Sequence, residues 1–216
     1  MNTNTKRLTT SAIMLAIAVS IAFICGLMPF LNLPFGGGFT IASMLPIVLI
    51  AYMYGTKWGL LTSATYSVLQ LLLSFNNVQA YFLPESDDYM GSVGAALAIC
   101  LIDYIIAYTV LGFGGIFRNK IKNKTASIVL GVLVALSLRY LAHIISGYIF
   151  FGAWAEWFFG QEGFYAIGGF ILDTFTGQGL SWIYTIFYNG LYMIPEIIIT
   201  IIVAIPISRI PYIKKY

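Results

Sequence analysis

The sequence predicts an all-α integral membrane protein with six transmembrane helices in a single bundle, formed by one membrane domain over residues 1–216. Hydrophobic residues make up 60% of the chain and charged residues 9%, and the mean hydropathy is +0.89. A surface that faces water needs far more charge than this. One bundle is expected because no linker or low-complexity stretch divides the chain.

Six stretches are long or apolar enough to cross a bilayer. The first is interpreted as a retained helix and not as a signal peptide, because its apolar run exceeds the usual ~7–15 residues. The second is short and lies next to Pro34 and Gly36 to Gly38, so we expect irregular backbone there that packs against other helices or lines a cavity. The six predicted segments are residues 8–30, 41–54, 58–75, 93–117, 127–151 and 180–207.

Basic residues gather on one side of the predicted membrane. Ten of the eleven Lys and Arg residues fall at the termini, in the turn after residue 54 and in the loop between the fourth and fifth helices. The positive-inside rule therefore predicts that both termini are on the cytoplasmic side of the cell membrane. The net charge of +3 thus needs no nucleic-acid partner. The ten residues are Lys6, Arg7, Lys57, Arg118, Lys120, Lys122, Lys124, Arg209, Lys214 and Lys215.

The two predicted outer loops, residues 76–92 and 152–179, contain no Lys or Arg. Apolar pieces in the second loop could suggest a seventh crossing, but that would place the basic C-terminus outside. We therefore predict a lid or an interfacial helix over the outer mouth. The acidic residues of these loops are Glu85, Asp87, Asp88, Glu156, Glu162 and Asp173.

Arg139 and His143, the only histidine, lie four residues apart in an apolar segment and therefore on one face of a helix. A charged side chain is costly inside hydrocarbon, so such residues normally face the protein interior, find a partner and mark a ligand or ion pathway. We predict that Asp103, in the fourth helix, pairs with Arg139. These helices would then build a polar, aromatic-lined pocket for a small ligand.

Depth along the helices supports such a pocket. At about 1.5 Å per residue, Asp103, Arg139, His143 and Asn189 lie roughly 12–18 Å from the outer helix ends and share one layer. Aromatic walls with a few convergent polar groups are typical of small-molecule sites. The predicted ring around this layer is Tyr104, Tyr140, Tyr184, Tyr188, Phe150 and Phe151, with Trp154, Trp157 and Trp182 near its mouth.

Purely structural roles are also open for these residues. Asp103 and Arg139 could form only a structural ion pair, and His143 could make only an interhelical hydrogen bond. Glu196 lies near the cytoplasmic side, so an interfacial or partner-facing role is favoured over the pocket.

Catalysis has little support in the sequence. A single histidine and the absence of a suitably spaced Cys, His and carboxylate cluster argue against a metal site. The sequence has neither a nucleophile elbow of the G-x-S-x-G kind nor a P-loop. Transport against a gradient would therefore draw its energy from a partner or a coupled ion.

Small residues at Ala12, Ala16 and Ser20 recur every four positions along the first helix. Such a stripe lets another helix approach closely, so it is a candidate partner-binding surface, although packing within the same chain is the simpler interpretation.

Five pieces of the sequence together resemble the thiamine-specific substrate-binding (S) component of energy-coupling factor (ECF) transporters, the ThiT family. They occur in the family's order and cover most of the membrane part. The pieces are AIMLAIAV, PFGGGFTIASMLPIVL, LIDYIIAY, LRYLAHIISGYIFFG and SWIYTIFYNGLYMIP.

The resemblance implies a six-helix bundle that binds thiamine from outside and has no cofactor of its own. It further implies docking, through Ala12 and Ala16, on a transmembrane coupling subunit that carries two cytoplasmic ATPases, which hydrolyse the ATP. The family's acidic residue and tyrosine that face the thiazolium cation correspond to Asp103 and Tyr104. Further family positions correspond to Arg139, His143, Phe151, Tyr184 and Asn189.

Two departures from the family pattern affect the expected site. Some relatives have tryptophans where this chain has Phe39 and Phe151, so stacking is expected to be weaker or to come from Trp154 or Trp182. Both outer loops are also longer than the family pattern. The alternatives are an S-component for a related vitamin or precursor, such as hydroxymethylpyrimidine or a B6 vitamer, and, from other classes, an intramembrane enzyme or a structural subunit.

Overall fold

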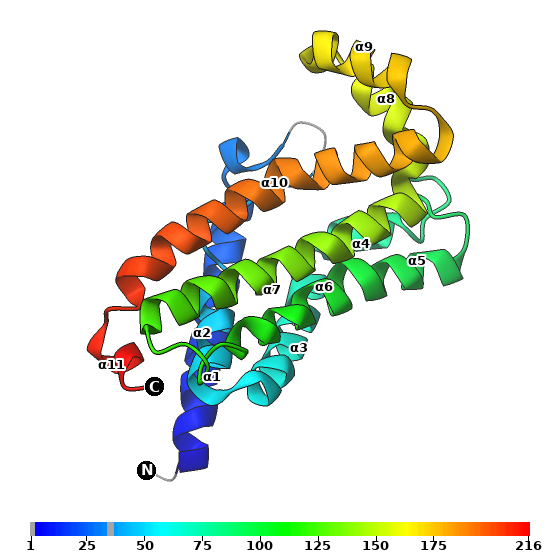
Figure 1. Cartoon of the computed structure of the whole chain (residues 1–216). Helices are drawn as coiled ribbons and strands as arrows, with labels where there is room; N and C mark the ends of the chain where they lie inside the picture. Colours follow the sequence, from blue (N-terminus) through cyan, green and yellow to red (C-terminus); the bar gives the residue numbers. More distant parts are fainter. Residues whose placement is uncertain (1–2, 34–36) are drawn as a thin grey trace.

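The computed structural model describes residues 3–33 and 37–216, so the expectations for Pro34 and Gly36 lie outside the described residues. Within those ranges the chain is a bundle of helices (Figure 1). Helix α1 (Thr3–Gly26) begins at the end of the bundle where the short C-terminal helix α11 (Pro211–Lys214) lies. We call this the proximal end, and the opposite end the distal end.

Four helical stretches in the described residues are long and apolar enough to cross a membrane: α1, residues 93–115, residues 124–159 and α10. The second and third are each assembled from several helical types. The second comprises α5 (Val93–Ile99), the π-helix η2 (Cys100–Ile106), α6 (Ala107–Thr109) and the 3-10 helix η3 (Val110–Gly115). The third comprises α7 (Lys124–Ser146), the π-helix η4 (Gly147–Phe151), the 3-10 helix η5 (Gly152–Trp154) and α8 (Ala155–Phe159), and α10 is Gly177–Ile207.

Helix α2 (Leu45–Tyr54) lies at the centre of the bundle, in contact with α1, α3 (Thr56–Leu73), η3 and α7. All of its residues except Tyr54 are buried. A helix that is apolar on every side is expected in such a position. Its 10 residues span about 15 Å, roughly half of a hydrocarbon core, so the preceding non-helical segment, residues 37–44, contributes the rest of this layer.

The predicted segments coincide with helices, but the count of six crossings stays a prediction. Besides the four spanning stretches, the predicted second and third segments are α2 and α3 (Thr56–Leu73). Helix α2 is too short to cross alone, and α3 carries a buried polar stripe that lowers its hydropathy. The first predicted segment ends early: α1 stops at Gly26, and a short 3-10 helix, η1 (Pro29–Leu31), follows.

Glycines bring backbones into direct contact in the proximal half. A Cβ atom at Gly131 of α7 would lie 2.1 Å from the carbonyl oxygen of Gly114, and one at Gly115 would lie 2.2 Å from that of Ala51. A Cβ at Gly112 would lie 2.4 Å from the backbone nitrogen of Leu60. Because small residues let helices approach this closely, α2, α3, η3 and α7 form one tightly packed unit.

Both predicted outer loops contain helices. The segment after α3 begins with α4 (Phe75–Ala80), and the later segment forms a hairpin of α8 and α9 (Tyr165–Thr174), joined by a 3-10 turn, η6 (Glu162–Phe164). Figure 1 shows α9 standing out from the distal end of the bundle beyond α10. Phe158, fully buried, joins this hairpin to Tyr184 and Tyr188 of α10 through ring contacts. The segment predicted to form a lid or an interfacial helix, residues 152–179, is therefore helical. Only its first part reaches the cavity described next.

Candidate functional site

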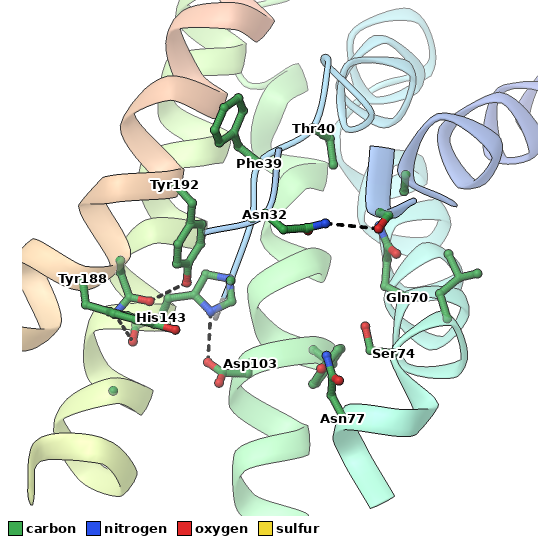
Figure 2. A pocket seen from close by; sticks show the side chains of 18 of the residues that line it. Asn32, Phe39, Thr40, Gln70, Ser74, Asn77, Asp103, His143, Tyr188 and Tyr192 are labelled. Atoms are coloured by element: carbon green, nitrogen blue, oxygen red, sulfur yellow. Dashed lines mark hydrogen bonds and ion pairs between the residues drawn. The ribbon is translucent and has the colours of Figure 1, made fainter. Parts of the chain in front are cut away.

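A cavity of about 830 Å³ occupies the distal half of the bundle, and we call it the distal cavity. Its walls come from the end of α1, residues 37–40, α3, α4, η2, α7, η4 and α10. Ten of its side chains are labelled in Figure 2. Predicted site residues that line it are Phe39, Asp103, Tyr104, Arg139, His143, Phe151, Trp154, Tyr184 and Asn189.

Asp103 and His143 form a hydrogen-bonded pair in the cavity wall. The Oδ1 atom of Asp103 lies 3.0 Å from Nδ1 of His143, and 19% and 10% of the two side chains are exposed (Figure 2). If Nδ1 donates its proton to the carboxylate, Nε2 carries the lone pair and can accept a hydrogen bond from a ligand. Nε2 is buried and has no hydrogen-bond partner among the described residues.

The predicted pairing of Asp103 with Arg139 is not formed. One nitrogen of the Arg139 guanidinium donates to the Tyr108 hydroxyl at 2.9 Å, and the group lies 4.3 Å from the centre of that ring. Its other terminal nitrogen contacts the sulfur of Met44 at 3.0 Å. The physical reason for the difference is the π-helix η2, in which the Ala107 N–H donates to the Ile102 carbonyl five residues earlier. The extra residue in this turn changes which side chains face α7.

The α10 wall is held by a hydrogen-bond network around Asn189. Its amide nitrogen donates to the carbonyl oxygens of His143, at 3.2 Å, and Thr185, at 2.8 Å. Its amide oxygen accepts a short hydrogen bond from the Tyr192 hydroxyl. Asn189 therefore ties α10 to α7 behind His143, and one lone pair of its oxygen is left for a ligand.

Aromatic side chains form the distal wall at a spacing of three residues. Phe151, Trp154 and Trp157 all line the cavity, with ring centres 6.3 Å and 5.7 Å apart in sequence order. The structure does not bring Trp182 to this wall. It stacks on Tyr148 with ring centres 4.1 Å apart and is 41% exposed, because position 182 lies on the outward face of α10.

Two other predicted ring residues, Tyr140 and Phe150, also lie outside the cavity lining. The Tyr140 hydroxyl instead donates to the carbonyl oxygen of Ile186, at 2.6 Å.

Glu196 has a different place from the one expected. It is 2% exposed, and its carboxylate accepts hydrogen bonds from both the backbone N–H and the hydroxyl of Thr40. Thr40 lines the cavity. The interfacial or partner-facing role predicted for Glu196 is therefore wrong. The carboxylate anchors the segment of residues 37–44 inside the bundle.

The polar wall that α3, α4 and the residue between them form was not predicted from the sequence. Gln70, Ser74 and Asn77 line the cavity and lie across it from His143 (Figure 2). The signal was present in the sequence as a polar stripe at helical spacing in an otherwise apolar segment. That stripe is Thr62, Ser63, Tyr66, Ser67 and Gln70, all buried.

The small residues of α1 face away from the bundle. Ala12, Ala16 and Ser20 are exposed, whereas Ser11, Ala18 and Cys25 are the buried residues of this helix. The stripe therefore does not pack within the chain, although that was the simpler interpretation of its sequence.

The described ranges contain no group of three His, Cys, Asp or Glu side chains that could hold a metal ion. The chemistry available in the cavity is thus that of two carboxylates, an imidazole, a buried guanidinium, amides and aromatic rings.

The chain is similar in sequence and in fold to known proteins. Residues 8–162 match the family described as Thiamine transporter protein (Thia_YuaJ). The chain is 32% identical over 208 residues to the thiamine transporter ThiT of Bacillus subtilis (strain 168), with 91% of this chain and 87% of that protein covered. A solved structure of ThiT from Listeria monocytogenes shares the fold, with a TM-score of 0.62 over 98% of each chain at 20% sequence identity.

Proposed function

Because the chain belongs to the thiamine transporter protein (Thia_YuaJ) family, we propose that it is the substrate-binding component of an ECF-type importer that captures thiamine from outside the cell. It is a membrane protein of vitamin uptake. It has no catalytic residues or cofactor of its own in this proposal, and ATP is hydrolysed by partner subunits.

The observation that carries the proposal is the half-buried Asp103 carboxylate in a cavity with aromatic walls. Thiamine carries a permanent positive charge on its thiazolium ring. His143 contacts one carboxylate oxygen, so the other is free to face the cation. Nearby rings, Tyr104 and Phe151 among them, add cation–π contacts of about 0.5–2 kcal/mol each.

The aminopyrimidine half of thiamine requires both donors and acceptors. Nε2 of His143 and the Asn189 amide oxygen supply acceptors, and the Tyr184 hydroxyl supplies a donor. We assign Phe39 and Trp154 to stacking against the ligand. Arg139 does not contact Asp103, so it leaves the carboxylate's charge for the ligand.

The proposed topology has six crossings, with both termini in the cytoplasm. Ten Lys and Arg residues at the proximal end support this orientation. The exposed stripe of Ala12, Ala16 and Ser20 is the proposed docking surface for the coupling subunit, since its small side chains admit a second helix.

Titration of the purified chain with thiamine tests the binding proposal. Trp154 and Trp157 line the cavity, so saturable quenching of tryptophan fluorescence is expected at sub-micromolar thiamine. A chain that gives no response, and no calorimetric heat, at millimolar thiamine would overturn it. Comparison with the uncharged pyrimidine fragment tests the related-vitamin alternative, because a ligand without the cation does not need Asp103.

Reconstitution with the energising subunits tests the transport proposal. Ala16→Leu is expected to abolish ATP-dependent uptake while thiamine binding by the isolated chain persists. Ile17→Phe, on the neighbouring exposed face of α1, is the matched control. Equal uptake by both variants would remove the stripe as the docking surface.

A further inference from the structure

Asp88 is a second carboxylate in the distal cavity, and neither the family resemblance nor the proposed site uses it. It is half-buried and lines the cavity from the segment between α4 and α5. Five other acidic residues occupy the segments 76–92 and 152–179, and none of them lines the cavity. The charge of Asp88 is therefore directed inward, whereas the others contribute only a diffuse negative field.

The local backbone holds Asp88 in this position. The N–H of Asp88 donates to the Ser86 hydroxyl at 3.2 Å. The N–H of Met90 donates to the Tyr81 carbonyl at 3.1 Å and closes the segment back on itself. Across residues 3–33 and 37–216, no Lys, Arg or His side chain lies within ion-pair distance of the Asp88 carboxylate. Within these residues the carboxylate thus has no basic neighbour that would compete with a cationic ligand.

Aromatic rings extend from Asp88 across the distal wall of the cavity. Tyr81 lies with its ring centre 6.5 Å from that of Phe151, and Trp154 and Trp157 continue the row. Burial raises the pKa of Tyr81, and the negative charges of Asp103 and Asp88 add to the effect, so its hydroxyl stays neutral. Asp88 and these rings line the same cavity, and a carboxylate together with aromatic rings is the chemistry that receives an organic cation.

We propose that Asp88, Tyr81 and Trp157 form a distal cation site, which receives the thiazolium cation before it reaches Asp103. The proposal rests on the proposed function, since it concerns the entry of the same ligand. Its physical consequence is kinetic. A negative charge in the cavity wall, apart from Asp103, raises the association rate and affects the dissociation rate little, because the ligand has left this site in the final complex.

Stopped-flow tryptophan fluorescence with thiamine tests the distal cation site. Asp88→Asn is expected to lower the association rate roughly 3- to 10-fold at low ionic strength, with the dissociation rate unchanged and the difference fading at high salt. Asp87→Asn is the matched control, because Asp87 is exposed in the same segment and does not line the cavity. It removes the same charge and should change the rate less than about 2-fold.

A second pair of variants tests the aromatic part. Trp157→Leu should slow association, whereas Trp182→Leu, which alters a tryptophan stacked away from the cavity, should not. The association rate of the uncharged pyrimidine fragment should be the same in Asp88→Asn and wild type. Thermal melting of each variant separates slow binding from a folding defect.

Each outcome bears on a different proposal. Failure of the wild-type chain to bind thiamine overturns the proposed function, and the distal cation site with it. Normal wild-type binding with equal rates in the Asp87 and Asp88 variants overturns the distal cation site alone. A faster dissociation rate in Asp88→Asn also overturns it, since Asp88 would then contact thiamine in the final complex.

Discussion

The proximal and distal halves of the bundle are built on opposite principles. In the proximal half, glycines of η3 and α7 remove side chains, so backbones touch and the space is filled. In the distal half, large aromatic and polar side chains surround an 830 Å³ cavity. The difference separates stability from binding: changes in the proximal half should act on unfolding, and changes in the distal half should act on ligand affinity.

Two carboxylates make the same contrast at the level of single residues. Glu196 is closed off, with its oxygens occupied by the backbone and side chain of Thr40. Asp103 has one hydrogen-bonded neighbour, His143, and faces the cavity. A buried acceptor that is saturated by its own chain has a structural role, whereas an unsaturated one beside a cavity is available to a ligand.

The largest effect is expected for Gly131→Ala in the proximal half. The new Cβ would meet the Gly114 carbonyl oxygen at 2.1 Å, and backbone cannot move aside as a side chain can. We expect a loss of roughly 3 kcal/mol in stability, seen as a lower melting temperature in detergent. Gly94→Ala in α5, where the nearest atom lies 4.0 Å away, should be neutral or slightly stabilising. Equal melting temperatures would contradict the glycine-packed proximal half.

Asp103→Asn should act on binding instead. Loss of the charge that we propose faces the thiazolium cation is expected to weaken thiamine binding about 30-fold, roughly 2 kcal/mol, with little change in melting temperature. Calorimetric titration measures the Kd of Asp103→Asn and of its control, Asp173→Asn, which removes an exposed carboxylate of α9. An unchanged Kd for Asp103→Asn would move the cation site elsewhere.

Glu196→Gln should affect both halves, because Glu196 holds the segment that joins α2 to the cavity wall. An amide keeps one acceptor for Thr40 but loses the charge that strengthens these hydrogen bonds. We expect a loss of about 1–2 kcal/mol in stability and a smaller loss of thiamine affinity. Thr200→Ala, which removes only a 3.5 Å contact with the same carboxylate, is the control. A change confined to affinity would place Glu196 in the binding site.

The smallest effect is expected for Phe158→Leu in the distal hairpin. Phe158 packs against Tyr184 and Tyr188, at ring-centre distances of 5.3 Å and 5.6 Å, and both tyrosines line the cavity. We expect thiamine affinity to fall by about 1 kcal/mol, close to five-fold. Phe159→Leu is the control, since the ring contacts of Phe159 are with Phe158, Phe164 and Phe187, none of which lines the cavity. Equal losses would mean that the hairpin acts only through stability.

Much of the fold could be predicted from hydropathy alone, because every long apolar run became a helix. The start of α2 could not, since the boundary depends on Thr40, whose side chain is hydrogen-bonded to both Ser43 and Glu196. The helices α4 and α8 are too short for periodicity to reveal. Their positions depend on tertiary contacts, such as those of Phe158 with α10.

The residues that line the distal cavity were easier to predict than the hydrogen bonds that these residues form. Asp103, His143 and Asn189 are polar residues in apolar helices, and each lines the cavity as expected. The partner of Arg139 was predicted on regular α-helical geometry, and the π-helix η2 changed it to Tyr108. Asp88 had no such signal, because an acidic residue in a loop is ordinary and only the fold shows that it faces inward.

Both π-helices sit beside the cavity and carry residues of its wall, Asp103 and Tyr104 in η2 and Phe151 in η4. Each stores a residue that a regular helix would not accommodate. Deleting a single codon within either stretch would let that turn rewind as a regular α-helix, so only side chains of the shortened turn would change direction. A genetic change of three nucleotides would thus redirect the cavity-facing carboxylate while the helix itself, and the fold around it, persists.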